Sequence, residues 1–413
     1  MKTKWLGRLC LGLAAIPLVI AGLGAARVSG APTTWPSLKP SEITASGKDA
    51  ARHFGDAPDD GGPLATDLSG DLKSADILKA TKKVGDWELA RHEHYFGQNW
   101  CWGALYTGFM GSAKGTGNPE FRDAMLAVAE KFHWKLASQG LKSADDICLA
   151  QTYLELYQEQ EHPDPQRIAF TKTALDALYN APPPSGHPLP WWWCDALYMG
   201  PSVWIGMYKV TGDVKYLDYM NKNWWATSDL LYDKDEHLYA RDAGFIGKTE
   251  ANGKKIFWSR GEGWVMGGLA RIIPLMPADF ADRGKYIAQF KEMAARIITL
   301  QGDDGLWRAG LLDPDAYVIP ENSGSSFFTF ALAWGINAGY LDKATYEPVV
   351  AKAWAGLVSN IYADGRLGCI QQTGAAPAHF KPTSSYCYGI GAFLLAGNEV
   401  NKLALEDAKH TRS

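Results

Sequence analysis

Two kinds of helical segment alternate along the sequence from about Thr81 to the C-terminus. Segments of the first kind contain Gly, Ala, aromatic residues and Cys with few charges, as in CWGALYTGFMG from Cys101 and CYGIGAFLLAG from Cys387. Segments of the second kind are charged and amphipathic, as in PEFRDAMLAVAEKFHWKLA from Pro119. A helix that is apolar all round is buried, whereas a helix with one apolar stripe lies outside. Six segments of each kind alternate, which indicates a repeat of six helical hairpins.

This repeat predicts an all-α fold, an (α/α)6 toroid in a single domain. The apolar helices form the inner ring, and their small residues permit close packing. No alternation of Val, Ile and Thr indicates a sheet beyond short connecting hairpins. An open helical solenoid is the alternative, but six hairpins of unequal spacing favour closure. Because the inner helices run parallel, their N-terminal ends share one face of the ring.

The first residues have the composition of a secretory signal. Lys2, Lys4 and Arg8 precede an apolar stretch from Leu9 to about residue 23, and small residues follow. The stretch is shorter than the ~20 residues of a spanning helix, which disfavours a membrane anchor. We therefore expect a signal peptide over residues 1–26, a flexible lead-in rich in Pro, Gly and Ser over 27–72, and the toroid over 73–413. The expected location is periplasmic or secreted, with no membrane contact after signal removal.

Charge and cysteine content exclude several other classes of partner. The net charge of −4 gives no indication of nucleic acid or an anionic membrane as a partner. Of the six cysteines one lies in the signal, no CxxC occurs, and no metal-ligand spacing is present. We expect buried thiols and no metal site, with one disulfide left open.

The shared face is predicted to collect aromatic, acidic and basic side chains from all six inner-helix ends. Flat rings stack on sugars and paired polar groups hold hydroxyls, so this composition is typical of a carbohydrate site. Asp145 or Asp146 could instead cap its helix, and Arg260 could be a structural ion-pair partner. The residues that lie at or near these ends include Trp100, Trp102, Asp145, Asp146, His187, Trp193, Asp195, Trp258, Arg260, Glu262, Trp264, Glu321, Asn322, Ser323, His379, Lys381 and Tyr386.

Asp195 directly follows three tryptophans, which bears on its chemistry. Helix N-termini and Arg260 favour an anionic ligand, but they also stabilise an ionised aspartate. A proton-donating aspartate needs burial or a nearby carboxylate to raise its pKa. The tryptophans can supply burial, and Asp145 or Asp146, one hairpin upstream, can supply the carboxylate.

Two motifs resemble a known enzyme family. W-x-D-x-L-Y-M runs from Trp193 to Met199 and W-x-R-G-x-G-W from Trp258 to Trp264. Over roughly residues 87–400 the chain resembles glycoside hydrolase family 105, the unsaturated rhamnogalacturonyl hydrolases, related to family 88. The resemblance implies an (α/α)6 barrel that needs no metal or organic cofactor. Its substrate would be an oligosaccharide with a terminal 4,5-unsaturated uronate, left by a polysaccharide lyase.

The resemblance also implies roles for individual residues. Asp195 matches the general acid/base, which protonates C4 of the vinyl ether while water adds at C5. Asp145 or Asp146 corresponds to the second aspartate, and the alternatives stay open. Substrate-binding positions are expected at Trp100, Trp102, His187, Trp193, Met199, Arg241, Trp258, Arg260 and Trp264.

Two positions depart from the family pattern. Glu262 stands where the family commonly has Asn, and Arg241 stands near a place that often holds His. Arg241 could bind the uronate carboxylate, or the enzyme could accept a differently decorated sugar.

The leading hypothesis is a hydrolase of unsaturated uronyl oligosaccharides, pectic rhamnogalacturonan or a similar glycan. One alternative is an inverting glycosidase that cleaves saturated glycosides with two carboxylates. Another is a sugar-binding toroid without catalytic activity.

Overall fold

Six outer and six inner helices alternate along the chain in the computed structural model, which describes residues 54–92, 95–117, 119–137 and 141–410. The outer helices are α2 (Ser74–His92), α4 (Pro119–Lys131), α7 (Gln166–Tyr179), α10 (Val214–Leu231), α12 (Arg283–Ile298) and α14 (Lys343–Ser359). The inner helices are α3 (Trp100–Thr116), α6 (Ala150–Gln158), α9 (Pro201–Thr211), α11 (Ser259–Ile272), α13 (Asn322–Asn337) and α15 (Cys387–His410). Short helices α5 (Ala144–Ile147) and α8 (Ala196–Met199) precede α6 and α9.

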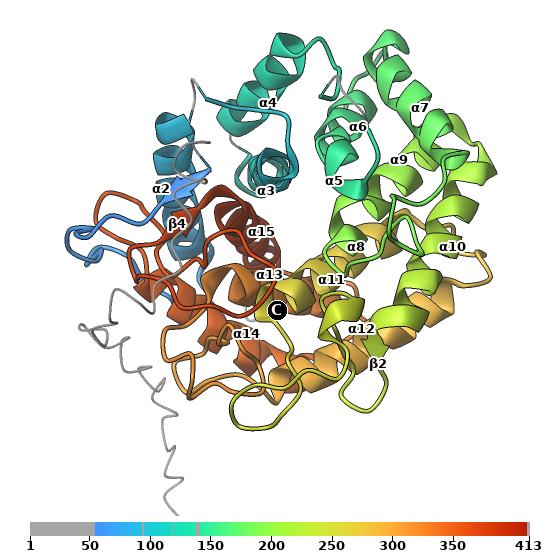
Figure 1. Cartoon of the computed structure of the whole chain (residues 1–413). Helices are drawn as coiled ribbons and strands as arrows, with labels where there is room; N and C mark the ends of the chain where they lie inside the picture. Colours follow the sequence, from blue (N-terminus) through green and yellow to red (C-terminus); the bar gives the residue numbers. More distant parts are fainter. Residues whose placement is uncertain (1–53, 93–94, 118, 138–140, 411–413) are drawn as a thin grey trace, which may run out of the picture.

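The inner helices close into a ring. Each one packs against its two inner neighbours, and α15 returns to pack along α3. Figure 1 shows the outer helices surrounding this ring in sequence order. The predicted all-α toroid is therefore confirmed, and the open solenoid is not what forms.

Sheet structure is confined to two short antiparallel pairs in the part of the chain that the structure describes. Strand β1 (Gly55–Asp56) pairs with β4 (Ser385–Tyr386), just before α15. Strand β2 (Tyr232–Asp233) pairs with β3 (Leu238–Tyr239), in the connection from α10 to α11. Three-residue 3-10 helices, η2 and η3, cover Ala243–Phe245 and Ile273–Leu275.

Glycine allows the inner helices to approach closely. A Cβ on Gly108 of α3 would lie 2.4 Å from the carbonyl oxygen of Gly391 in α15. A Cβ on Gly268 of α11 would lie 2.2 Å from the carbonyl oxygen of Leu197 in α8. Such contacts leave no room for a side chain, so the backbones themselves touch across the ring. The small residues of the inner segments have the role expected from the sequence.

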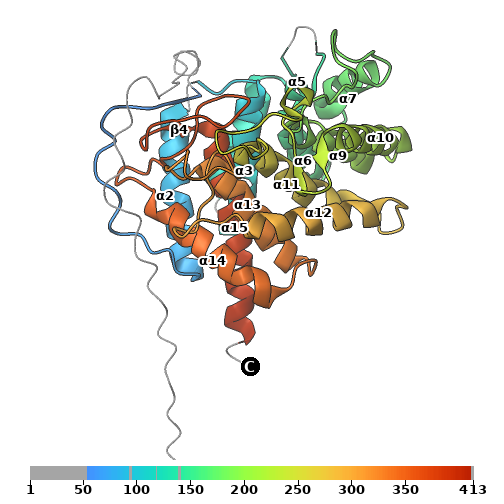
Figure 2. The ribbon, with the colours of Figure 1, turned by 60° about the horizontal axis from the view of Figure 1, so that its bottom comes forward.

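The N-terminal part of the described chain corrects one expectation. Residues 54–72, predicted as part of a flexible lead-in, lie against the outside of the ring beside α2 and β4 (Figure 2). Besides the β1–β4 pair, the backbone N–H of Ala65 donates to the carbonyl of Ile361, and Ala363 donates to Pro63. The expected signal peptide and the lead-in up to residue 53 lie outside the described residues.

The described cysteines are buried thiols. All five cysteines in the described part of the chain are buried, and none forms a disulfide. Burial raises the pKa of the Cys148 and Cys369 thiols, so they stay protonated. A search of the described helices finds none with the length and apolar character needed to cross a bilayer.

The contact between Gly108 and Gly391 predicts a large effect of one added methyl group. Gly108→Ala forces α3 away from α15 and is expected to lower the free energy of unfolding by about 1–3 kcal/mol, as overpacking does. The matched control is Gly284→Ala in α12, where an added Cβ meets no atom within 4 Å. Urea unfolding should show that the control is no less stable than the wild type. Equal destabilisation of both variants would contradict the packing argument.

Candidate active site

Asp195 lies at the N-terminal face of the ring, where a bridge and a short helix fix it. Trp193 forms an isolated β-bridge with Asp242, and the N–H of Cys194 donates to the carbonyl oxygen of Arg241 at 2.8 Å. Helix α8 begins at the next residue, with Asp195 at its N-cap position. The carboxyl group is almost completely buried, as the preceding tryptophans predict.

Opposing effects act on the Asp195 carboxyl group. Burial raises its pKa, and this effect outweighs the positive charges of Arg241 and Arg260 and a hydrogen bond from the Cys194 thiol. The thiol donates to Oδ1 at 3.3 Å, and Nε of Arg241 lies 3.8 Å from the same oxygen. Asp195 therefore keeps its proton to a higher pH than an aspartate in water does.

Asp145 is the second carboxyl group of the site. It belongs to α5, which packs beside α8, and its side chain retains partial exposure. Burial raises the pKa of Asp145 to about 7, and the negative charges of Asp195 and Asp146 add to the effect while Arg241 opposes it. Because two neighbouring carboxylates repel each other, Asp145 and Asp195 form a pair that retains one proton up to about pH 7.

Asp146, the other candidate, caps the helix to which both aspartates belong. Its Oδ2 accepts hydrogen bonds from the backbone N–H groups of Lys142 and Ser143 and from the Ser143 hydroxyl. This is the capping box of α5. The Asp146 carboxylate is thus used to begin the helix, whereas the pKa of Asp145 is raised in part by the negative charge of Asp195.

Arg241 is brought to Asp195 by the β2–β3 hairpin. The buried Glu262 accepts a hydrogen bond from the N–H of Tyr239 in β3 at 2.8 Å, which holds the strand two residues before Arg241. Burial raises the pKa of Glu262 well above its ordinary value, so it is a neutral acceptor. The Arg241 guanidinium pairs with Asp242 at 2.9 Å, but its buried Nε has no hydrogen-bond partner among the described residues. Both departures from the family pattern therefore act on the same edge of the site.

Only one of the three consecutive tryptophans offers a partly exposed ring. Trp191 and Trp193 are buried, and Trp191 packs edge-on against Tyr219 in the core. Trp192 is partly exposed, and His187 stacks on it with ring centroids 3.7 Å apart. The Arg241 guanidinium lies 5.7 Å from the Trp192 ring. The sequence prediction listed Trp193 as substrate-binding and did not list Trp192. Adjacent side chains in an extended segment point to opposite sides, and this alternation is the signal that could have distinguished the two.

Arg260 is less available to a ligand than the sequence suggested. It is 1% exposed, and its guanidinium donates to the carbonyl oxygens of Gln371 and Gln372 at 2.7 and 2.8 Å. Trp258 is also buried and donates through Nε1 to the Gln371 side chain. These two residues hold the loop after residue 370 in place. The two motifs do not predict this function, because Gln371 lies outside both of them.

The remaining predicted binding residues divide between the site and the core. Trp100 begins α3 at the N-terminal face, is partly exposed, and lies edge-on to the buried Trp264 at 6.1 Å. Met199 is buried at the end of α8. Trp102 is a correction: it is buried among Phe54, His92, Phe96 and Tyr106, away from Trp264 and its aromatic neighbours. Two residues along a helix turn the side chain by about 200°, so Trp100 and Trp102 face opposite ways.

The assembled site pairs a proton-holding dyad with one cation and an aromatic edge. Such a dyad can give a proton to a substrate and take one from water. In the described part of the chain, no three His, Cys, Asp or Glu side chains are grouped as metal ligands would be. The geometry fits acid–base chemistry on an anionic, ring-shaped ligand.

A family model described as Glycosyl Hydrolase Family 88 matches residues 75–404. The chain belongs to this family. Because this is a family of glycosyl hydrolases, the protein is an enzyme. We therefore set aside the alternative of a sugar-binding toroid without catalytic activity. An unsaturated 3S-rhamnoglycuronyl hydrolase from Formosa agariphila is 43% identical over 321 residues, which cover 74% of this chain and 85% of the relative.

Solved structures extend the comparison of the family 88 chain. One named as a polysaccharide lyase is 32% identical with a TM-score of 0.75, over 81% of this chain and 98% of its own. A possible family 105 member from Salmonella enterica shares the fold at 18% identity, with a TM-score of 0.66 over 80% of this chain and 94% of its own. The resemblance to families 105 and 88 that the motifs indicated is confirmed.

Because Asp146 caps α5 and Asp145 does not, substitutions at the two positions are expected to differ in their effects on stability. Asp146→Ala removes the acceptor that begins α5 and is expected to lower the free energy of unfolding by about 0.5–2 kcal/mol. Asp145→Asn removes a carboxyl group that resists ionisation, so stability at pH 8 should be retained or increased. Urea unfolding at pH 8 measures both. A larger loss for Asp145→Asn than for Asp146→Ala would contradict the assignment.

Proposed function

We propose that this enzyme releases a terminal 4,5-unsaturated uronic acid from lyase-generated oligosaccharides by hydrating the vinyl ether double bond. The observation that carries the proposal is the buried pair of Asp145 and Asp195 beside Arg241. The pair supplies one proton near neutral pH, and Arg241 supplies a positive charge for the uronate carboxylate. The hydrolase activity in the name of the Formosa relative supports this reaction.

The same name supports a finer assignment of the substrate. It specifies a 3S-rhamnoglycuronyl unit, in which we take 3S to denote a sulfate on O3 of rhamnose. We propose a rhamnose modified in this way as the sugar next to the uronate. The stacked His187 and Trp192 rings extend outward from Arg241 and offer a flat face for that sugar. Unsulfated pectic rhamnogalacturonan fragments are the substrates to compare.

Arg241 links substrate binding to proton transfer in this proposal. In the free enzyme its charge favours ionised Asp195, so the proton of the pair resides mainly on Asp145. When the substrate carboxylate binds at Nε of Arg241, it neutralises that charge, and the proton is drawn to Asp195. Binding of the correct anion thereby prepares the acid.

The reaction then proceeds with Asp195 as acid and base. Protonated Asp195 gives its proton to C4, and the positive charge that develops at C5 takes up water. Ionised Asp195 accepts the proton that the water loses, which restores the pair. The hemiketal at C5 opens to a ketone, and the hemiacetal left at C1 collapses to an aldehyde and releases the neighbouring sugar.

Absorbance of the double bond separates this proposal from its competitors. A hydrolase of unsaturated uronates lowers the absorbance of lyase-digested oligosaccharides. A polysaccharide lyase, as one related structure is named, raises the absorbance of an intact polysaccharide. An inverting glycosidase cleaves saturated glycosides and leaves the absorbance unchanged. Export remains part of the proposal, supported by the composition of residues 1–26.

Substitution of the two aspartates tests the assignment of the acid pair. Asp195→Asn and Asp145→Asn each remove a carboxyl group of the pair and are expected to lower kcat by about 10²–10⁴-fold. Asp146→Asn is the matched control, because it keeps an oxygen acceptor for the capping box and should leave kcat near the wild-type value. Turnover is measured as loss of double-bond absorbance. Wild-type turnover by Asp195→Asn would refute its role.

A second set of variants tests Arg241 through the pH profile. Wild-type kcat/KM is expected to fall above about pH 7, as Asp145 loses its proton. Arg241→Gln removes a positive charge that lowers the pKa of both aspartates, so the fall should move to higher pH. Loss of a charged hydrogen bond to the carboxylate should also raise KM by about 10–100-fold.

The control for Arg241→Gln is a variant of Arg296 in α12, which contacts the loop between β2 and β3. Arg296→Gln breaks an ion pair with Glu236 at 2.6 Å, away from the carboxyl pair, and should leave the pH profile unchanged. Arg241→Lys keeps the charge and should keep the wild-type position of the fall. An unshifted profile in Arg241→Gln would count against the proposed coupling.

A further inference from the structure

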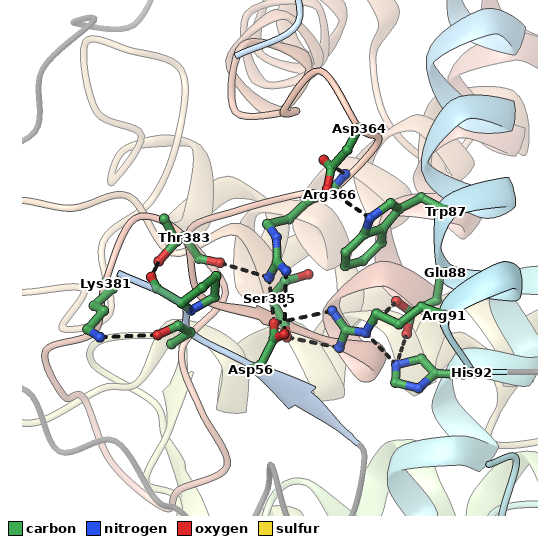
Figure 3. Close-up of polar contacts among 12 residues, drawn as sticks. Asp56, Trp87, Glu88, Arg91, His92, Asp364, Arg366, Lys381, Thr383 and Ser385 are labelled. Atoms are coloured by element: carbon green, nitrogen blue, oxygen red, sulfur yellow. Dashed lines mark hydrogen bonds and ion pairs between the residues drawn. The ribbon is translucent and has the colours of Figure 1, made fainter. Parts of the chain in front are cut away.

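Residues 54–72, which we name the N-terminal strap, begin with a cluster of charged groups outside the active site. Figure 3 shows Asp56 between the guanidinium groups of Arg366 and Arg91. Arg366 donates to Oδ1 of Asp56 at 2.5 Å and to Oδ2 at 3.4 Å, while Arg91 donates to Oδ1 at 3.4 Å. The two arginines also lie 4.9 and 4.5 Å from the ring of Trp87.

Through Asp56, the two arginines connect the strap to helix α2 and to the segment that leads into β4. Arg366 also donates to the carbonyl oxygen of Thr383, and Arg91, from α2, donates to that of Ser385. Arg91 further contacts the buried pair of Glu88 and His92, whose closest atoms are 3.2 Å apart. Without Asp56, two cations would face each other with fewer counter-charges, so the strap neutralises this cluster.

The strap backbone presses on Tyr386. Gly55 pairs with Tyr386, and a Cβ at Gly55 would lie 2.5 Å from the Tyr386 ring. The N–H of Cys387, the first residue of α15, donates to the carbonyl oxygen of Phe54 at 2.8 Å. Nothing larger than glycine fits between the strap and this tyrosine, so the position of the strap sets the position of the tyrosine.

A row of rings leads from Tyr386 into the active site. Tyr386 stacks on Tyr388 with centroids 5.9 Å apart, and Tyr388 stacks on Trp100 with centroids 5.5 Å apart. The Tyr388 hydroxyl donates to the carbonyl oxygen of Gln371, one of the carbonyls that hold Arg260. Movement of Tyr386 would therefore be transmitted to Trp100 at the substrate face.

We propose that the N-terminal strap positions Trp100 for substrate binding, with the Asp56–Arg366 ion pair fixing the strap and the Tyr386–Tyr388 stack transmitting its position. Asp56 is thus a positioning residue about which neither motif gives information. The inference rests on the proposed function only for the statement that Trp100 meets the sugar. The coupling of the strap to the rings is independent of the reaction.

The test compares Asp56→Ala with a matched variant on the same strap. Asp59→Ala removes an ion pair with Lys381 at 2.6 Å, three residues further along, at a carboxylate that is almost fully exposed. Asp56→Glu retains the charge. Hydrogen exchange of the full-length chain is followed at Cys387, whose N–H bonds to the strap, and at residues 100–102. Kinetic constants are measured on unsaturated oligosaccharides.

Asp56→Ala is expected to speed exchange at both places by roughly tenfold and to raise KM by about fivefold with little change in kcat. Asp59→Ala should match the wild type, and Asp56→Glu should recover most of the loss in KM. A lower melting temperature for Asp56→Ala, with KM and exchange at residues 100–102 unchanged, would overturn the proposal. If the wild type shows no turnover, the proposed function fails, and exchange at residues 100–102 alone decides for or against the strap.

Discussion

Contact between the backbones of the inner helices is the constraint on which the rest of this structure depends. Glycines such as Gly108 and Gly268 remove the side chains that would keep the helices apart. The ring therefore closes tightly, and the N-terminal ends of its helices share one face. Asp195 stands at such an end, and its pKa is raised because burial there outweighs the neighbouring positive charges.

Arg260 and Arg241, two arginines near the acid pair of Asp145 and Asp195, have different functions. Arg260 belongs to an inner helix, and the carbonyl oxygens of Gln371 and Gln372 occupy its donors. Arg241 comes from a hairpin outside the ring, and its buried Nε has no hydrogen-bond partner in the part of the chain that the structure describes. Neutral Glu262 supports this hairpin through Tyr239. Arg260 thus holds the loop after residue 370, whereas Nε of Arg241 stays open to an anionic ligand in the proposed reaction.

The sequence was sufficient for the architecture because the two kinds of helix differ in composition along their whole length. It also predicted the burial of Asp195, because tryptophans directly precede that residue. It could not separate Asp145 from Asp146, since the choice depends on which carboxylate turns back to cap α5. Trp102 was misplaced because burial in the core and burial at a site favour the same residue types. The strap was read as flexible because a two-residue strand carries no periodicity and its partners are remote in sequence.

The distance along the chain between the strap and its partners has a consequence for how the molecule forms. Asp56 and Arg366 are separated by 310 residues, and β4 and α15 come later still. During synthesis Arg91 of α2 is available to Asp56 early, but β1 has no strand to pair with until β4 has been made, so the strap closes on the ring in a late event. Ordering so long a loop is slow compared with forming one helical hairpin. The β1 backbone therefore stays without its partner strand for most of synthesis.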